Sequence, residues 1–381
     1  MFTIQTLNKI SPEGLGRFPR ARYKISDEGG GVDGILLRSA NLHDFELEDN
    51  TLAIARAGAG TNNIPIDRCT ERGIVVFNTP GANANAVCEL VIFGLLASSR
   101  QVIKAVEWAK GLIGQGDAIP KLIEKTKSQF VGPELRGKTL GVVGLGAIGA
   151  RVTDAAIALG MKVIGYDPFL SVEAAWRLDS HAMMSELLDT LYSDCDYISL
   201  HAPLTKETKA MVNAESIAQM KDGARLLNFS RGDLIDDDAV LSALDSGKLS
   251  YYVTDFANEK LLKHDKCLCI PHLGASTPEA EDNCAFMAAE QLIDYLEHGN
   301  IVNSVNFPRC KLIRNGPYRL CVTALPSPEL IATLSSQIHG IMAIKSQSNA
   351  ALCYTIMDLL QPVDIEEIKA IDGVIRVRLL T

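Results

Sequence analysis

One stretch, residues 139–168, constrains the fold of this chain more than any other part of it. An apolar, β-branched run at 139–143 leads without a gap into Gly144-Leu-Gly-Ala-Ile-Gly149, where a helical pattern begins. A second apolar run at 162–166 ends in Asp167. Strand, glycine turn, helix and strand in this order predict a βαβ unit that carries the G-x-G-x-x-G dinucleotide fingerprint.

Each part of this fingerprint has a physical role. Gly144 permits the sharp turn, Gly146 lets the backbone approach a pyrophosphate, and Gly149 lets helix and strand pack closely. The helix N-terminus offers N–H groups and a partial positive charge to the phosphates. Asp167 is placed to accept hydrogen bonds from both ribose hydroxyls and would repel a 2′-phosphate, which favours NAD over NADP. Such glycines also serve simple close packing, but the two strands, the helix and the acid together favour the cofactor.

Composition limits the class of protein. At 381 residues, with 47% hydrophobic and 22% charged residues, the chain is typical of a soluble globular protein of two or three domains. A net charge of −9 without blocks of like charge argues against nucleic-acid and membrane partners. Residues 1–10 lack a signal pattern and no run reaches membrane-span length, so we expect a cytoplasmic protein. The nine cysteines form no C-x-x-C pair, so no metal site is expected.

Small or polar residues follow every predicted strand of the N-terminal part. The strands at 34–37, 52–55 and 74–77 lead into Arg38-Ser39, Gly58-Ala59-Gly60 and Asn78 to Asn83. Ligands of open α/β sheets bind beyond the carboxyl ends of the strands, so we expect these residues to line one side of a cleft. The apolar segment 84–100 predicts a buried helix that Asn83 or Asn85 caps, which makes its N-terminus an anion site. An ordinary surface salt bridge is the alternative for Arg38.

In the second half of the chain, too, polar or small residues follow each predicted strand. Predicted strands at 197–200, 224–229, 250–254 and 267–270 lead into His201-Ala202-Pro203, Ser230-Arg231, Asp255 and Pro271-His272-Leu273-Gly274. These residues therefore fall at one end of one sheet. The polar, poorly periodic segment 111–127 is interpreted as a crossover or an oligomer contact.

The sequence pattern of the C-terminal part predicts a separate unit. A helix at 279–298 leads back to the N-terminal domain and a linker follows at 303–317. Residues 318–380 then read strand, helix, strand, strand, helix, strand, which is the ferredoxin-like order βαββαβ. We therefore predict an α/β protein with two doubly wound parallel-sheet domains, a flavodoxin-like substrate domain and a Rossmann-type cofactor domain, plus this small domain. The predicted bounds are 1–88 with 277–310 for the substrate domain, 89–276 for the NAD-binding domain and 317–381 for the last.

Three side chains suit hydride transfer, which needs a cation for the substrate and an acid/base for its hydroxyl proton. Arg231 offers a planar fork that can hold a carboxylate. His272 titrates near neutrality, and Glu259, in the loop after the preceding strand, could orient its ring. The alternatives are a turn histidine, a solvated acid and a helix-side ion pair, and the three residues beside a dinucleotide fold argue against them.

Several motifs resemble the D-isomer-specific 2-hydroxyacid dehydrogenases and, within them, the phosphoglycerate branch. They are 144–149, Asn228-Phe-Ser-Arg-Gly232, Thr254-Asp-Phe-Ala-Asn-Glu259, Pro271-His-Leu-Gly-Ala-Ser-Thr277, Ala57-Gly-Ala-Gly60 and Asn78-Thr-Pro-Gly81. The resemblance implies NAD-dependent oxidation of D-3-phosphoglycerate to 3-phosphohydroxypyruvate, the first step of phosphorylated serine synthesis, by a homodimer or homotetramer. A glyoxylate or hydroxypyruvate reductase and a non-catalytic NAD(H)-sensing protein of the same fold remain alternatives.

The resemblance also assigns residues. The catalytic positions are Arg231, Glu259 and His272. The cofactor positions are Gly144, Gly146, Ala147, Ile148, Gly149, Asp167, His201, Ala202, Pro203, Ser230, Asp255, His272 and Gly274. The substrate positions are Arg38, Ser39, Gly58, Ala59, Gly60, Asn83, Arg231 and His272.

One departure from the family pattern concerns the C-terminal unit, which resembles the ACT domain that binds serine in some members. Pro326 and Glu329 stand where the pattern has Asn and Gly, and Gly340 replaces a second Asn. An effector whose polar groups lose such partners binds more weakly, by about 1–3 kcal/mol for each. We therefore expect weak serine inhibition or none.

Overall fold

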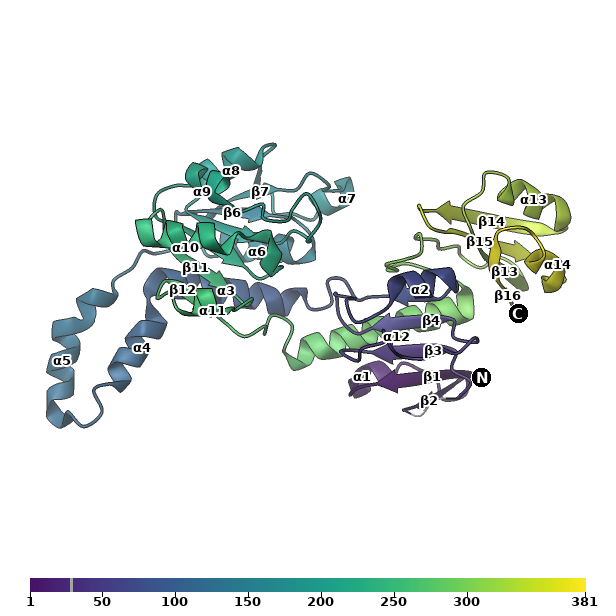
Figure 1. Cartoon of the computed structure of the whole chain (residues 1–381), viewed down its shortest axis with the longest axis horizontal. Helices are drawn as coiled ribbons and strands as arrows, with labels where there is room; N and C mark the ends of the chain where they lie inside the picture. Colours follow the sequence, from purple (N-terminus) through teal and green to yellow (C-terminus); the bar gives the residue numbers. More distant parts are fainter. Residues whose placement is uncertain (28–29) are drawn as a thin grey trace. The chain divides into compact units, whose positions relative to one another are not determined.

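The computed structural model describes residues 1–27 and 30–381, which form two compact units (Figure 1). One unit contains Met1–Asn83 and Pro278–Thr381, and the other contains Ala84–Thr277.

The second unit is built on a parallel sheet. Its strands are β6 (Thr139–Val143), β7 (Lys162–Tyr166), β8 (Met183–Met184), β9 (Tyr197–Leu200), β10 (Ala224–Asn228), β11 (Leu249–Thr254) and β12 (Cys267–Cys269). Their order in the sheet is β12-β11-β10-β9-β6-β7-β8, and every pair is parallel. The winding direction reverses between β6 and β9, which is where such sheets bind dinucleotides. The Rossmann-type prediction is confirmed.

Helices connect these strands. They are α3 (Ala84–Arg100), α4 (Val102–Lys110), α5 (Ile119–Thr126), α6 (Ala147–Ala158), α7 (Val172–Ala175), α8 (Leu188–Asp194), α9 (Ala214–Gln219), α10 (Asp237–Ser246) and α11 (Glu259–Leu262), with 3₁₀ turns at Gly116–Ala118, Lys127–Phe130 and Gly232–Leu234. The segment 111–127, interpreted as a crossover or an oligomer contact, contains α5, where Pro120 stands in the first turn and favours helix formation. Figure 1 shows α4 and α5 extending away from the sheet of their unit.

Helix α3 is buried on one side only. Val87, Val91 and Leu95 are buried, but Phe93 and Leu96 are 45% and 44% exposed, so burial on nearly all sides was a wrong expectation. Asn85 lies inside the helix, where its amide donates to Glu89, and so does not cap it. No single helix of the described residues is long and apolar enough to cross a membrane; α3 and α4, bent by 67°, pass that test only as a pair.

The first unit carries a five-stranded parallel sheet in the flavodoxin-like order β2-β1-β3-β4-β5. Its strands are β1 (Phe2–Leu7), β2 (Tyr23–Ser26), β3 (Gly34–Leu37), β4 (Ala53–Arg56) and β5 (Val75–Phe77), and its helices are α1 (Pro12–Leu15), α2 (Ile66–Glu71) and α12 (Pro278–His298). Helix α12 packs Ala285, Ala288 and Leu292 into the core that covers one face of this sheet. The sequence did not predict β1 or β2.

An antiparallel sheet completes the first unit. It has the order β14-β15-β13-β16 and the predicted ferredoxin-like connections. Its elements are β13 (Tyr318–Ala324), α13 (Leu330–Gln337), β14 (Ile341–Ser348), β15 (Cys353–Leu359), α14 (Ile365–Lys369) and β16 (Val374–Leu380).

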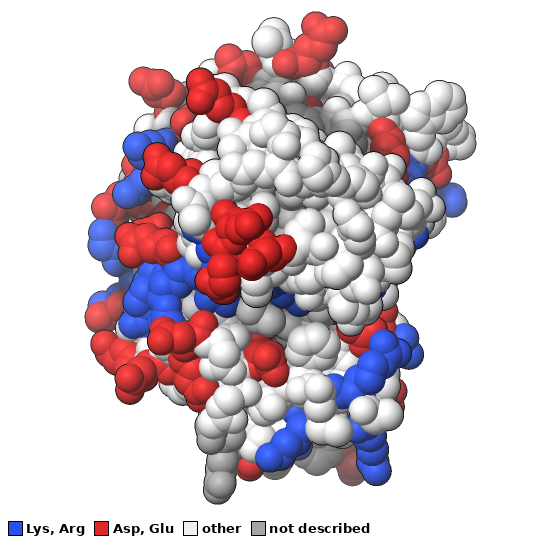
Figure 2. Space-filling model, turned by 90° about the vertical axis from the view of Figure 1, so that its right-hand side faces the viewer, with Lys and Arg blue, Asp and Glu red and all other residues white. Residues whose placement is uncertain are grey.

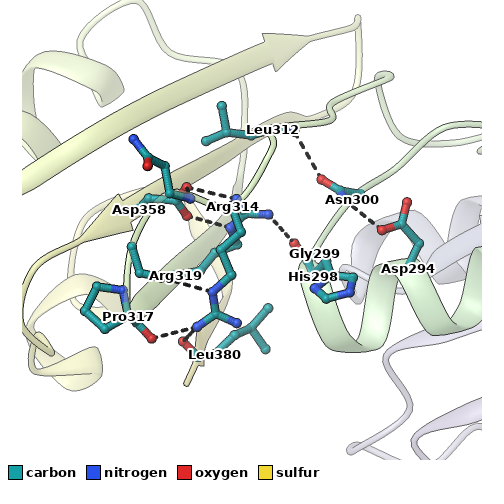
Figure 3. A network of polar contacts seen from close by, with 12 residues as sticks. Asp294, His298, Gly299, Asn300, Leu312, Arg314, Pro317, Arg319, Asp358 and Leu380 are labelled. Carbon is teal, nitrogen blue, oxygen red and sulfur yellow. Dashed lines mark hydrogen bonds and ion pairs between the residues drawn. The ribbon is translucent and has the colours of Figure 1, made fainter. Parts of the chain in front are cut away.

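This antiparallel sheet donates hydrogen bonds to the end of α12 (Figure 3). Arg319 forms a two-pointed ion pair with Asp358 and donates its third nitrogen, Nη1, to the carbonyl of His298 at 2.8 Å. Arg378 donates to the carbonyls of Tyr295 and Leu296, and the Tyr354 hydroxyl donates to Gly299. The last carbonyls of a helix lack partners within the helix and carry partial negative charge, so two arginines and a tyrosine satisfy them here. We call Arg319, Tyr354 and Arg378 the α12 cap.

Candidate functional site

The glycine turn after β6 has the shape that a dinucleotide needs. Gly144 has φ +92°, and a Cβ there would lie 2.7 Å from the carbonyl oxygen of His201. A Cβ on Gly149 would lie 1.9 Å from the carbonyl oxygen of Gly144, so the helix can approach the strand only with glycine at this position. A Cβ on Gly146 would meet no described atom within 4 Å. The first and third glycines therefore serve the fold, and the second faces open space beside the N-terminus of α6.

Asp167 closes this turn from the end of β7. Its Oδ2 accepts the Leu145 N–H and its Oδ1 accepts the Phe169 N–H, both at 2.9 Å. Each carboxylate oxygen can accept a second hydrogen bond, so two acceptors remain for ribose hydroxyls. The N-terminus of α6 begins at Ala147 and Ile148, which places its N–H groups beside the same turn.

Two neighbouring loops are tied to each other. The Ser230 hydroxyl donates to the carbonyl of Ala202 at 2.6 Å. The buried Asn228 holds the loop that follows β10, because its Oδ1 accepts the Ser230 N–H and its amide donates to the carbonyl of Arg231 at 2.9 Å. Sequence reasoning gave Asn228 no role, although it stands at the strand end three residues before the predicted arginine. The Pro203 carbonyl accepts a hydrogen bond from Thr208.

His201 is an uncharged imidazole. Its Nε2 lies 2.9 Å from the Ser199 hydroxyl, and its Nδ1 is buried without a hydrogen-bond partner among residues 1–27 and 30–381. Burial lowers the pKa of His201 to about 4. The ring is therefore neutral at pH 7 and leaves one buried nitrogen for a bound group.

The structure brings Asp255, Arg231 and His272 into one electrostatic group. Burial raises the pKa of the Asp255 carboxyl, while the charges of His272 and Arg231 and the Gly274 N–H act in the opposite direction. Its Oδ1 is buried and has no hydrogen-bond partner within the described part of the chain. Arg231 is exposed and donates Nη1 to the Ser230 carbonyl, and the His272 ring lies 5.0 Å from the ring of Phe256. Both predicted catalytic side chains are therefore accessible, while the acid that they act on is buried.

Glu259 is not part of this group. It is the first residue of α11, its side chain is 84% exposed, and its carboxylate accepts from Lys263 at 2.5 Å, one helical turn later. No hydrogen bond or ion pair joins it to His272 among the residues that the structure describes. The predicted Glu259–His272 pair is therefore not formed here, because the carboxylate lies on the solvent side of a short helix. The catalytic role assigned to Glu259 stays a prediction.

The substrate residues predicted in the first unit gather at the carboxyl end of its sheet. Arg38 forms an ion pair with Glu281, on the first turn of α12, and its carbonyl accepts from the Arg56 guanidinium at 3.0 Å. The Ser39 N–H donates to the Asn8 side chain. Asn83 is half-buried and immediately precedes α3, which leaves it as the candidate cap of that helix.

Arg56 is a candidate that sequence reasoning missed. A Cβ on Gly58 would lie 2.6 Å from its Nη1 and a Cβ on Gly60 would lie 3.5 Å from it, so the guanidinium lies directly over the glycine run. Asn78 donates to the Ala59 carbonyl and fixes that run. The available signal was position: Arg56 is the last residue of β4 and stands at the same sheet end as Arg38.

These residues fit NAD. The open space at Gly146, the remaining acceptor capacity of Asp167, and the unpartnered polar atoms of His201 and Asp255 together offer contacts for phosphate, ribose and amide groups. Among the described residues, no group of three or more His, Cys, Asp or Glu side chains could hold a metal ion.

A Gly146→Ala variant should separate cofactor binding from folding. Because the added methyl meets no described protein atom, the thermal unfolding temperature should stay within about 2 °C of the wild type. The NADH dissociation constant, measured by fluorescence titration, should rise at least tenfold, or about 1.4 kcal/mol, because the methyl occupies the space of the pyrophosphate. Gly149→Ala is the contrasting variant and should destabilise the fold. An unchanged NADH affinity in Gly146→Ala would place the pyrophosphate elsewhere.

Comparison with known proteins identifies the family. Residues 93–274 match the family described as D-isomer specific 2-hydroxyacid dehydrogenase, NAD binding domain. D-3-phosphoglycerate dehydrogenase of Bacillus subtilis is 33% identical over 326 residues, which cover 81% of this chain and 59% of that protein. The same enzyme of Methanocaldococcus jannaschii is 38% identical over 293 residues, 74% of this chain and 53% of that protein.

A solved structure extends the comparison. The cofactor (NAD+) bound 3-phosphoglycerate dehydrogenase of Entamoeba histolytica is 27% identical, with a TM-score of 0.62, over 80% of this chain and 98% of that one. The chain spans between 50% and 59% of the length of the curated relatives that it matches. Residues 93–274 therefore have the sequence of an NAD-binding domain of the D-isomer specific 2-hydroxyacid dehydrogenases.

Proposed function

We propose that this chain oxidises D-3-phosphoglycerate to 3-phosphohydroxypyruvate with NAD, the first step of phosphorylated serine synthesis. The observation that carries the proposal is the group formed by Arg231, Asp255 and His272 at the strand ends of an NAD-binding domain. Relatives named D-3-phosphoglycerate dehydrogenase, 33% to 38% identical to this chain, support the choice of substrate.

The side chains of the second unit have distinct roles in this reaction. NAD, when bound, supplies the hydride acceptor. Arg231 holds the C1 carboxylate with its planar fork and polarises the C2 oxygen. His272 takes the C2 hydroxyl proton in oxidation and returns it in reduction. The buried Asp255, through its unpartnered Oδ1, can accept a hydrogen bond from the nicotinamide amide.

Two arginines of the first unit suit a phosphate group. Arg38 and Arg56 stand at the same sheet end, and a guanidinium binds two phosphate oxygens at once. Replacing Arg38 by alanine should therefore raise KM for 3-phosphohydroxypyruvate by one to two orders of magnitude, roughly 1.4–2.7 kcal/mol. The kcat/KM for hydroxypyruvate, which has no phosphate, should change less than threefold. Steady-state NADH oxidation with both substrates checks this, and an equal loss for both would remove Arg38 from the phosphate site.

The substrate assignment is tested by NADH oxidation with 3-phosphohydroxypyruvate, hydroxypyruvate and glyoxylate side by side. We expect a kcat/KM at least a hundredfold higher for the phosphorylated compound, about 2.7 kcal/mol of transition-state discrimination. Equal rates would move the protein to the general reductases of the family. NADH binding without turnover of any of the three would support a sensor instead.

The proposed partners are the small-molecule substrate and further copies of this chain, in a homodimer or homotetramer. None of the residues of α4 and α5 is buried, and Val102, Val106 and Ile113 are exposed apolar residues on this projecting segment. A nucleic-acid partner is not proposed, because the net charge is −9 and basic and acidic side chains are interspersed on the face drawn in Figure 2.

Serine should inhibit this enzyme weakly or not at all. Pro326 and Glu329 are exposed ahead of α13 and offer neither the amide nor the bare backbone expected of a serine site. In a serine titration up to about 10 mM, activity should remain above half, which corresponds to a binding energy weaker than about −2.7 kcal/mol. Strong inhibition at micromolar serine would show that the domain binds its effector through other residues.

A further inference from the structure

One carboxylate lies directly against a proposed phosphate-binding arginine. Glu281, on the first turn of α12, places Oε1 2.6 Å from Nη1 of Arg38. The two side chains are 44% and 38% exposed, so an anion in solution can reach the pair. The arginine that we assign to the phosphate therefore already has an anionic partner within the protein.

The charges of Arg38, Arg56 and Glu281 all act on one buried group, the thiol of Cys284. The buried Cys284 thiol has a raised pKa, chiefly through burial, and the charges of Arg38 and Arg56 act to lower this pKa while Glu281 raises it. The contacts agree with this, because Arg56 Nε donates to the Arg38 carbonyl at 3.0 Å and Arg38 pairs with Glu281. Together they carry a net charge of +1, whereas a phosphate monoester carries roughly −1.5 to −2 at pH 7.

Glu281 differs from the other acids at the start of α12. Asp282 is engaged elsewhere, because its Oδ1 accepts from the Ser11 hydroxyl at 2.5 Å. Glu279 is exposed and has no ion pair within the described part of the chain. All three acids gain from the positive helix N-terminus, so that general effect does not explain why one of them contacts the arginine.

We propose that Glu281 is a selectivity residue that competes with the phosphate of the substrate for Arg38. The inference rests on the proposed function. It adds that a carboxylate of the protein itself competes with the substrate at the phosphate site. An incoming phosphate must separate Arg38 from Glu281 and then lie near a second negative charge. Glu281 therefore weakens the binding of every anion at this point, free inorganic phosphate included, and leaves substrates without a phosphate unaffected.

Glu281→Gln removes the charge and keeps the shape of the side chain. The KM for 3-phosphohydroxypyruvate and the inhibition constant of inorganic phosphate should both fall roughly two- to fivefold, the range expected of an exposed ion pair. The kcat and the KM for hydroxypyruvate should stay at the wild-type values. Glu279→Gln, the same charge change two residues earlier on the same turn, is the matched control and should change none of these constants.

A double-variant cycle decides whether Arg38 is the residue through which Glu281 acts. In an Arg38→Ala background, Glu281→Gln should no longer alter the phosphate constants. The proposal is overturned if Glu281→Gln leaves both constants unchanged, raises them, matches Glu279→Gln, or acts equally without Arg38.

The phosphate measurement keeps this test separate from the substrate assignment. Inhibition by phosphate is measured with hydroxypyruvate as the substrate, and phosphate binding is followed in parallel by phosphorus NMR on the full-length protein with NADH present. A wild-type enzyme without preference for the phosphorylated substrate would refute the proposed function, while the phosphate constants of the two glutamine variants would still support or refute the competition.

Discussion

Replacing His272 by asparagine is expected to lower kcat for the reduction of 3-phosphohydroxypyruvate by roughly two to four orders of magnitude, the usual contribution of a positioned general acid. Asparagine keeps a hydrogen-bonding side chain but cannot deliver a proton near neutral pH. The NADH dissociation constant should stay within about threefold, since the glycine turn and Asp167 lie at other strands of the sheet. A large loss of kcat with intact cofactor binding would identify proton transfer as the defect.

The control for this variant is His181→Asn. His181 lies in the same unit, is exposed, and pairs with Asp179 far along the chain from the catalytic loop. Its replacement should leave kcat unchanged. A second readout is the pH dependence of kcat/KM, which reports the essential acid and base of the free enzyme and should change when His272 is replaced. A loss below tenfold with an unchanged pH profile would remove His272 from proton transfer.

The site around His272 could be predicted from the sequence only in part. The type and position of Arg231 and His272 follow from strand ends in one parallel sheet, and the structure places both beside Asp255. The partner of the histidine does not follow from spacing. Glu259 and Asp255 both lie after β11, and only the start of α11 at Glu259, with Lys263 one turn on, shows that Glu259 points to solvent.

The fold was predictable where an apolar run of strand length ends at small or polar residues that mark the end of the strand. β6, β7 and β9 are mostly apolar because both faces of a parallel sheet are covered, and their predicted bounds match the structure. β1 was missed because Gln5 is buried among apolar neighbours, and β2 is a four-residue edge strand. Arg56 was missed because it belongs to a strand, so its function depends on the glycines that its side chain covers.

The α12 cap could not be predicted from the sequence at all, because its hydrogen bonds join residues that lie 21 to 83 positions apart. Arg319 and Asp358 are each 0% exposed, and the arginine donates Nε and Nη2 to the carboxylate at 2.6 and 2.9 Å. Removing one partner of such a buried ion pair strongly destabilises the fold, because the remaining charge stays buried without a counter-charge or water to stabilise it. Without Arg319, the Asp358 carboxylate would keep one hydrogen bond, from the Asn315 N–H at 2.7 Å.

Replacing Arg319 by methionine should therefore lower the free energy of unfolding of the unit that holds it by about 3–5 kcal/mol. The change strands the buried Asp358 carboxylate and removes the donor to the His298 carbonyl at the end of α12. Urea unfolding of the full chain, with hydrogen exchange read separately at β13 and β15, measures the effect in the correct unit. NADH affinity should not change, because Ala84–Thr277 forms the other unit.

Two further variants decide whether charge burial is the cause. The double variant Arg319→Met with Asp358→Leu removes both charges and should recover a large part of the lost stability, since apolar replacements of buried pairs are often close to neutral. Lys369→Met breaks an exposed pair with Glu366 in the same domain and should cost less than about 1 kcal/mol. If the double variant were no more stable than Arg319→Met, the stranded charge would not be the cause, and the lost hydrogen bond to the His298 carbonyl would account for the destabilisation. The α12 cap would then be held mainly by its contact with the helix end.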